Sequence, residues 1–123
     1  MSSQRIQVYN ATRETWLVED GRAARGFWPR LRGLIGHEPL ARGQGLLLDP
    51  GKSIHTCFMG FPIDVVYLDE DHVVRGLDRD LKPWRIGGFY SRVRRVLELP
   101  VGAIEASNTQ EGDRLEVRGA DGG

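Results

Sequence analysis

The sequence predicts a small, mainly β fold, either a sandwich or a partly closed barrel, with one or two short helices. Sixteen glycines are scattered over 123 residues and divide the chain into short segments, which favours strands and tight turns over long helices. Several segments alternate polar with apolar residues or are rich in β-branched residues, as strands are. Many short strands with few helices indicate a sandwich or a barrel.

Length and charge restrict the classes of function. A chain of 123 residues has room for one hydrophobic core, so we expect a single domain over residues 1–123, compact from about residue 5 to about residue 118 and followed by a short flexible tail. Seventeen Lys plus Arg balance seventeen Asp plus Glu, so no overall field attracts the protein to nucleic acid or to an anionic membrane. We expect a monomer or weak homodimer that binds no nucleic acid.

The sequence contains no apolar run long enough to span a membrane, and its start lacks the pattern of a signal peptide. The single cysteine excludes an intramolecular disulfide, which is consistent with a reducing compartment. We therefore expect a cytoplasmic protein without membrane insertion.

The N-terminal half is predicted to contain a hairpin, a helix and a buried strand. Residues 5–10 (RIQVYN) alternate, and residues 15–18 (TWLV) follow a polar turn, which indicates the hairpin. Residues 23–35 carry apolar side chains at helical spacing and predict the helix, with Pro29 in its first turn and Gly36 as its end. Residues 46–48 (LLL) predict the strand, which the Asp-Pro-Gly turn at 49–51 ends. Residues 54–59 are expected to be extended.

The C-terminal half is predicted to be richer in strands. Residues 63–68 (IDVVYL) are the clearest strand, and an acidic link at 69–71 joins them to a second strand over 72–77. Residues 93–99 (VRRVLEL) alternate with a period of two, which predicts a strand that Pro100 ends. Residues 101–107 predict one helical turn, and residues 110–113 predict a turn before a last strand over 115–117.

The run at 54–69 (IHTCFMGFPIDVVYLD) resembles the bacterial and archaeal family named domain of unknown function 192. The motifs RGLIG at 32–36 and GLLL at 45–48 support the resemblance, as do VLELPVG at 96–102 and GD at 112–113. The order and spacing of these motifs are specific, and they cover about residues 5 to 118. The motif has the His-Thr-x-x-Met-x-x-Pro-Ile-Asp form of one subgroup. The resemblance implies a compact, mainly β domain, and it brings no agreed reaction, cofactor or substrate.

Five side chains are candidates for a ligand-binding site. His55 and Thr56 are polar residues in an apolar run, Asp64 begins the most apolar strand, and Trp84 and Arg85 lie in a loop bounded by proline and glycine. We hypothesise that they gather in one cleft that binds a small polar ligand or a protein segment. Each has an alternative role: Asp64 as a latch to loop backbone, the Trp84 loop as packing over the barrel, and the His-Thr pair as a corner between strands.

Four further residues are assigned structural roles. Cys57 and Met59 are predicted to fill the core, and Pro62 is predicted to fix the chain before the strand at 63–68. Glu98, a charged residue in an apolar context, is predicted to pair with Arg94.

Two kinds of chemistry at this segment are not expected. His55 and Met59 lie roughly 13 Å apart along a strand, too far for one metal ion, so we expect neither a metal nor a cofactor. Cys57 could be activated by His55, but the sequence shows neither a glycine elbow for an oxyanion nor an orienting acid nearby.

Three functions stay open, and a non-enzymatic one is favoured. The first is an accessory module that binds a ligand or a protein segment without catalysis. The second is a small hydrolase or transferase that uses His55 and Asp64 as a general acid/base pair. The third, by association with His-Thr members, is an auxiliary subunit of an envelope or pilus-type assembly system. The enzyme requires a pocket that collects both residues, whereas the subunit requires an exposed apolar patch.

Overall fold

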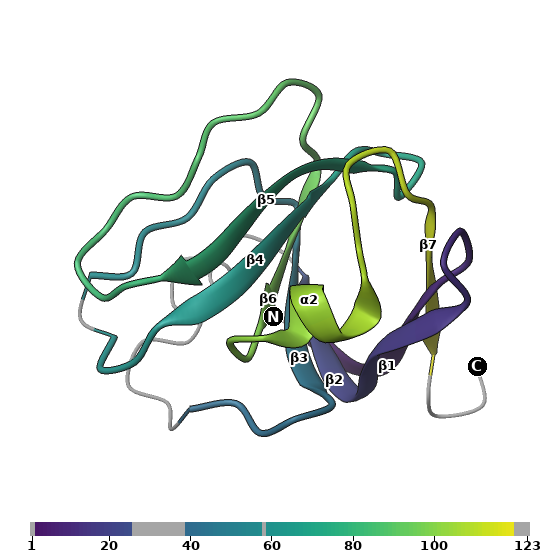
Figure 1. Ribbon diagram of the computed structural model, residues 1–123, viewed down its shortest axis with the longest axis horizontal. Helices are drawn as coiled ribbons and strands as arrows, with labels where there is room; N and C mark the ends of the chain where they lie inside the picture. The colour runs from purple at the N-terminus through teal and green to yellow at the C-terminus, as the bar shows by residue number, and fades with distance from the viewer. Residues whose placement is uncertain (1, 26–38, 58, 120–123) are drawn as a thin grey trace.

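Seven strands form one curled sheet in the computed structural model, which describes residues 2–25, 39–57 and 59–119. The sheet order is β5-β4-β6-β3-β2-β1-β7, and a short helix, α2, lies against the sheet where it curls (Figure 1). The predicted mainly β fold is therefore confirmed, and of the two forms expected, a sandwich or a partly closed barrel, the sheet has the second. The elements are β1 (Ser2–Asn10), β2 (Thr15–Arg25), β3 (Gln44–Asp49), β4 (Ile63–Leu68), β5 (Val74–Leu81), β6 (Arg95–Leu99), α2 (Ala103–Ser107) and β7 (Leu115–Gly119).

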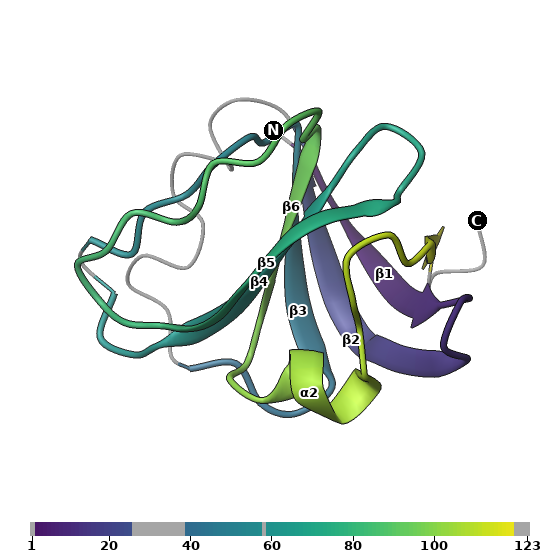
Figure 2. The same cartoon turned by 45° about the horizontal axis from the view of Figure 1, so that its top comes forward.

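The two edges of the sheet meet at one corner. The β2–β3 pair is parallel, and the other strand pairs of the described chain are antiparallel. At the start of β5, Val74 N donates to Asp113 O over 2.8 Å, and Leu115 N donates to His72 O over 2.9 Å. Figure 2 shows how the sheet curls so that β5 and β7 approach each other at this corner. The barrel is closed there by these bonds, and β5 is the edge strand of the sheet along the rest of its length.

Apolar side chains cover both faces of the sheet. One layer, inside the curl, contains residues of all seven strands together with Ile104 of α2. The second layer, on the other face, contains Val65, Tyr67 and Val96, and Met59 covers them from outside the sheet. Because both faces are covered, every residue of β4 is buried.

Most predicted elements are present, although several have other bounds; the strand predicted over 72–77, for example, spans Val74–Leu81. Residues 23–25 belong to β2 rather than to a helix, and the rest of the predicted helix lies outside the described residues. Residues 54–57 and 59 form no strand, because the backbone hydrogen bonds of Ile54 and Thr56 go to residues 84–87. His55 makes only an isolated bridge, to Ile86 in the same segment. The strand predicted over 93–99 begins at Arg95, since Arg94 N donates to Leu68 O beyond the regular pairing of β6.

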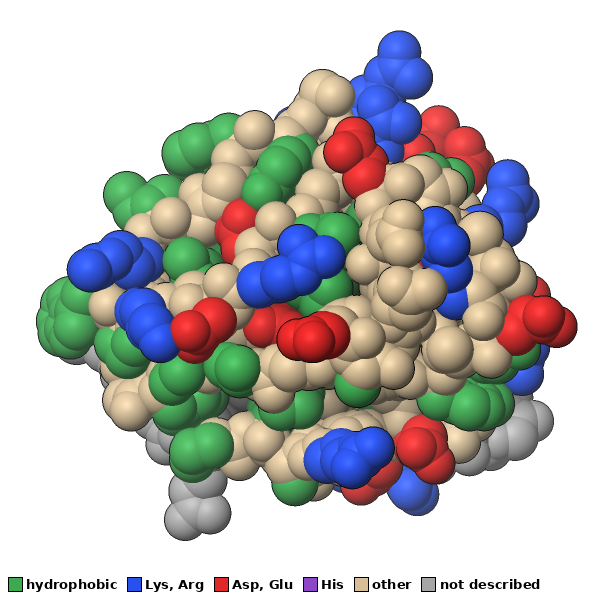
Figure 3. Space-filling view, viewed as in Figure 1, with side chains coloured by type: hydrophobic (Ala, Val, Ile, Leu, Met, Phe, Trp, Pro, Cys, Tyr) green, Lys and Arg blue, Asp and Glu red, His purple; other side chains and the backbone are tan. Residues whose placement is uncertain are grey.

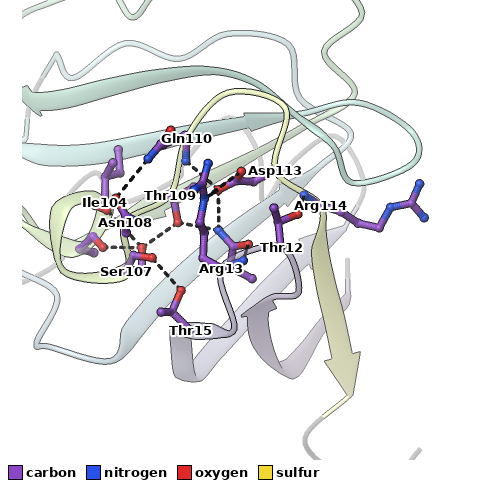
Figure 4. Close-up of polar contacts among 12 residues, drawn as sticks. Thr12, Arg13, Thr15, Ile104, Ser107, Asn108, Thr109, Gln110, Asp113 and Arg114 are labelled. Atoms are coloured by element: carbon purple, nitrogen blue, oxygen red, sulfur yellow. Dashed lines mark hydrogen bonds and ion pairs between the residues drawn. The ribbon is translucent and has the colours of Figure 1, made fainter.

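A buried polar network joins the β1–β2 turn to the link between α2 and β7 (Figure 4). Asn10 Nδ2 donates to Thr109 Oγ1 (3.1 Å) and to Asp113 Oδ2 (3.0 Å), and the Ser107 and Thr109 hydroxyls are 2.7 Å apart. Arg13 Nε donates to both carboxylate oxygens of Asp113. Burial would raise the pKa of Asp113, but the bonds from Arg13 and Asn10 outweigh it and the pKa is lowered. The network stabilises the fold.

Candidate functional site

Thr56 holds the loop of residues 82–90, called here the 82–90 loop, against the segment before β4. Its N–H donates to Arg85 O, and its hydroxyl accepts from Arg85 N, both over 2.8 Å. The same hydroxyl lies 2.5 Å from Lys82 O, to which it donates. Trp84 N donates to Thr56 O over 3.1 Å. Thr56 is fully buried, so these bonds form away from water and fix the first half of the loop.

Asp78 on β5 fixes the second half of the loop. Its carboxylate accepts from the N–H of Gly88 (2.8 Å) and from the hydroxyls of Tyr90 (2.7 Å) and Tyr67 (2.6 Å). Burial, followed by the bond to Asp78, raises the pKa of Tyr67 and raises that of Tyr90 to about 12. Both hydroxyls therefore keep their protons at neutral pH and remain donors to Asp78.

Three glycines allow this arrangement. A Cβ atom on Gly76 or on Gly88 would overlap the ring of Tyr90, and one on Gly87 would overlap the hydroxyl of Tyr67. Without these close approaches the loop could not lie against β5.

The 82–90 loop exposes large hydrophobic side chains although its backbone is fixed. The exposed fractions are 58% for Trp84, 69% for Ile86 and 79% for Phe89. Hydrophobic side chains follow the course of the loop along the upper left of the space-filling view (Figure 3). Scattered exposed hydrophobic residues are ordinary, but three within six residues form a patch of the kind seen at interaction surfaces.

A shallow, open groove of about 350 Å³ runs between β5 and the loop. Its lining includes three basic side chains, Arg79, Lys82 and Arg85, beside Ile86. Lys82 Nζ forms an ion pair with Asp80 at 2.6 Å. Within the described chain, Arg79 and Arg85 form no ion pair with a carboxylate. The surface therefore combines apolar side chains with two arginines that can receive an anionic group.

The structure brings together four of the five candidate residues. Thr56 binds the backbone of Trp84 and Arg85, and the exposed His55 bridges to Ile86 next to them. The Thr56 side chain is buried, so it is not available to a ligand. Its backbone and its hydroxyl instead support the loop.

Asp64 does not join them. Its Oδ2 accepts from the N–H groups of Gly102 (3.1 Å) and Ile104 (3.0 Å), and its Oδ1 accepts from Asp80 N (2.9 Å). Side chains alternate along a strand, so Asp64 shares the α2 face of β4 with Val66, whereas the segment at 54–57 lies over the other face. The single cleft expected from the sequence is not formed, and Asp64 has the geometry of the latch to loop backbone.

The four residues assigned structural roles differ in how deeply they are buried. Met59 is buried in the second apolar layer, and Cys57, a free thiol, is half-buried like Pro62. Glu98 does not pair with Arg94: Arg94 is exposed before the strand begins, and Glu98 is 2% exposed opposite Val65 on β4. Burial raises the pKa of Glu98 to about 8.

The described residues offer no metal centre, since no three His, Cys, Asp or Glu side chains among them lie close enough to hold an ion. No helix within the described ranges has the length and apolar character needed to cross a bilayer.

Sequence reasoning missed two parts of this surface, the Asp78 cluster with its tyrosines and the exposed Phe89. The run Gly87-Gly88-Phe89-Tyr90 contained a usable signal, because adjacent glycines next to a tyrosine permit a ring to lie on backbone.

Residues 9–117 match the family described as DUF192, "Uncharacterized ACR". The chain belongs to this family, as the sequence motifs indicated. An archaeal relative, a UPF0127 protein of Pyrococcus furiosus, is 34% identical over 112 residues, which cover 89% of this chain and 96% of the relative. A UPF0127 protein of Pyrococcus horikoshii is 39% identical over 64 residues, which cover 52% of this chain and 55% of the relative.

Two crystal structures share the fold. A protein of Sinorhizobium meliloti 1021, described as a candidate transcription regulator, superposes with a TM-score of 0.75 at 25% identity over 94% of both chains. A protein of unknown function from Novosphingobium aromaticivorans has a TM-score of 0.77 at 17% identity, over 91% of this chain and 83% of its own. The family description and the UPF0127 names state no activity.

Proposed function

We propose that this protein is a non-catalytic binding module and that it binds a protein segment at the 82–90 loop, with His55 beside it. The observation that carries the proposal is that Trp84, Ile86 and Phe89 are exposed on a loop whose backbone Thr56 and Asp78 hold in place. A loop pinned in this way cannot fold its hydrophobic side chains into the core. Because the surface is already ordered, binding loses little conformational entropy.

The geometry gives less support to a hydrolase or transferase. A general acid/base pair requires His55 and Asp64 on one pocket wall. The oxygens of Asp64 accept three backbone N–H groups, and the residue is 2% exposed on the α2 face of the sheet. A carboxylate held in this way supports structure rather than proton transfer.

A protein partner agrees better with the surface than a small polar ligand does. Small-molecule sites are concave and enclose most of the ligand, whereas the groove beside the loop is shallow and its neighbouring side chains project outward. An exposed apolar patch is also what an auxiliary subunit of an envelope or pilus-type assembly would present, and that role remains the alternative within protein binding.

Site-specific photo-crosslinking tests the proposal. In one strain of the native organism, the full chain is produced with p-benzoylphenylalanine in place of Phe89. In a second strain the same amino acid replaces Val101, an exposed apolar residue (48%) on the turn before α2. We expect one protein to crosslink from position 89 only. That protein, purified, should bind the wild type and lose affinity by about tenfold or more with Phe89→Ser, but not with Val101→Ser. Equal crosslinking from both positions, or binding that Phe89→Ser leaves unchanged, would contradict the proposal.

A further inference from the structure

We infer that the 82–90 loop binds a protein segment that carries acidic side chains next to apolar ones. The inference rests on the proposed function and adds the chemistry of the partner. It starts from the juxtaposition of Ile86 with Arg79 and Arg85 around the groove along β5.

The side chains that line the groove carry a net positive formal charge of one, because Arg79, Lys82 and Arg85 stand against Asp78 and Asp80. Lys82 and Asp80 neutralise each other in an ion pair. The carboxylate of Asp78 points to three donors, the hydroxyls of two tyrosines and the N–H of Gly88. Arg79 and Arg85 are exposed, and no carboxylate of the described residues pairs with either. Since the whole chain has a formal charge of zero, this surplus is local to the groove.

Arginine is suited to this recognition because its guanidinium group binds a carboxylate through two parallel hydrogen bonds. Ile86 lines the groove together with the two arginines, and Trp84 and Phe89, exposed on the same loop outside the groove lining, supply further apolar contact area. Interfaces usually place such aromatic anchors at their centre, with charged groups at the rim that select the partner and speed association. An acidic segment with apolar residues matches both parts.

The segment is recognised by side chains rather than added as a strand to the sheet. β5 is the edge strand, but its register with β4 shifts between the pairs Ile63–Leu81 and Val65–Asp78, and Asp80 has a φ of 52°. Bulges and charged side chains are the usual means by which an edge strand resists pairing with another chain. The outer edge of β5 therefore does not offer a regular ladder of backbone donors and acceptors.

An anionic membrane is the other surface that apolar and basic side chains can contact. Polybasic segments that bind anionic lipids contain roughly four to eight Lys or Arg, whereas the groove has three, one of them paired with Asp80. Arg79 and Arg85, which have no carboxylate partner among the described residues, fit individual carboxylates better than a continuous lipid surface.

A random display library of peptides of about 16 residues, selected on the purified full chain, tests the inference. We expect enriched peptides that combine aromatic or aliphatic residues with Asp or Glu. The synthetic form of the strongest peptide should bind about tenfold more weakly to Phe89→Ser and at least about fivefold more weakly to Arg79→Glu/Arg85→Glu.

Two matched variants serve as controls. Val101→Ser removes an exposed apolar side chain elsewhere, and Arg114→Glu reverses a charge on a side chain that extends away from the polar network (Figure 4). Neither should change the affinity. Raising NaCl from about 0.05 M to about 0.5 M should weaken binding to the wild type and affect the double arginine variant less.

The remaining outcomes are distinguishable. Peptides that depend on Phe89 but carry no acidic residues would overturn the inference and leave the proposed function standing. If no enriched peptide depended on Phe89, the proposed function would fail and the inference with it. A third outcome is that the wild type sediments with phosphatidylglycerol/phosphatidylcholine vesicles and that Phe89→Ser abolishes this binding. It would identify a membrane as the partner and overturn the inference.

Discussion

Asp64 joins three parts of the chain, because its carboxylate accepts backbone N–H groups from Gly102, from Ile104 and from Asp80. Asp64→Ala leaves these donors without a partner in a buried place. We expect the free energy of unfolding to fall by about 1–3 kcal/mol in urea titrations. Glu105→Ala, a change at an exposed carboxylate on α2, is the control and should have little effect. A neutral Asp64→Ala variant would mean that the carboxylate is not a latch.

Glu98 predicts an unusual dependence of stability on pH. Its pKa is raised by burial from an ordinary value of 4.5 to about 8. Between these values the folded protein holds a proton that the unfolded chain has released, so the stability linked to Glu98 is full below pH 4.5 and is lost as the pH rises to about 8. Glu98→Gln removes this loss. We expect the variant to be more stable than the wild type at about pH 8 and similar to it at about pH 4.5. Unfolding curves that differ equally at both pH values would contradict this.

At the scale of elements, the sequence was informative where the pattern is local. β4 begins and ends where its apolar run does, and the helical turn of α2 follows Pro100 as expected. The segment at 54–57 was not predictable as an irregular support, because its hydrogen bonds go to residues 82–87, which are far along the chain. Thr56 and Trp84 were expected to be neighbours, and they are. Asp64 was expected beside them but lies on the α2 face of β4, because its partners depend on which face of that strand the helix covers.

The contact between β5 and the 82–90 loop gives a prediction for Gly76. A Cβ atom at this position overlaps the ring of Tyr90, so Gly76→Ala should destabilise the protein by about 1–3 kcal/mol and increase proteolysis within the loop. Gly60→Ala is a matched control, because a Cβ atom at Gly60 meets no atom within 4 Å. If the two variants had the same thermal midpoint and the same cleavage rate, the ring would not lie on Gly76.

For the whole molecule, the polar network of Asn10, Thr109 and Asp113 holds the barrel where its ends approach each other. Asn10→Ala removes the donor to both partners, and we expect a loss of about 1–3 kcal/mol in the free energy of unfolding at neutral pH. Because the pKa of Asp113 is lowered below 3.8, its contribution is present above that pH and is lost as the pH falls through the folded value. The difference between Asn10→Ala and the wild type should therefore shrink in strong acid, and a constant difference would contradict this role.

The central claim is that the apolar surface at Trp84, Ile86 and Phe89 is already ordered in the free protein. Amide hydrogen exchange of the unmodified chain tests it most directly, since N–H groups of the loop form hydrogen bonds to Thr56, to Asp78 and to the carbonyl of Ile54. We predict that the amides of residues 84, 85, 87 and 88 exchange about a hundredfold or more slowly than those of an unstructured peptide. Exchange of these amides at unstructured rates would show a loop that is not preformed and would contradict the account.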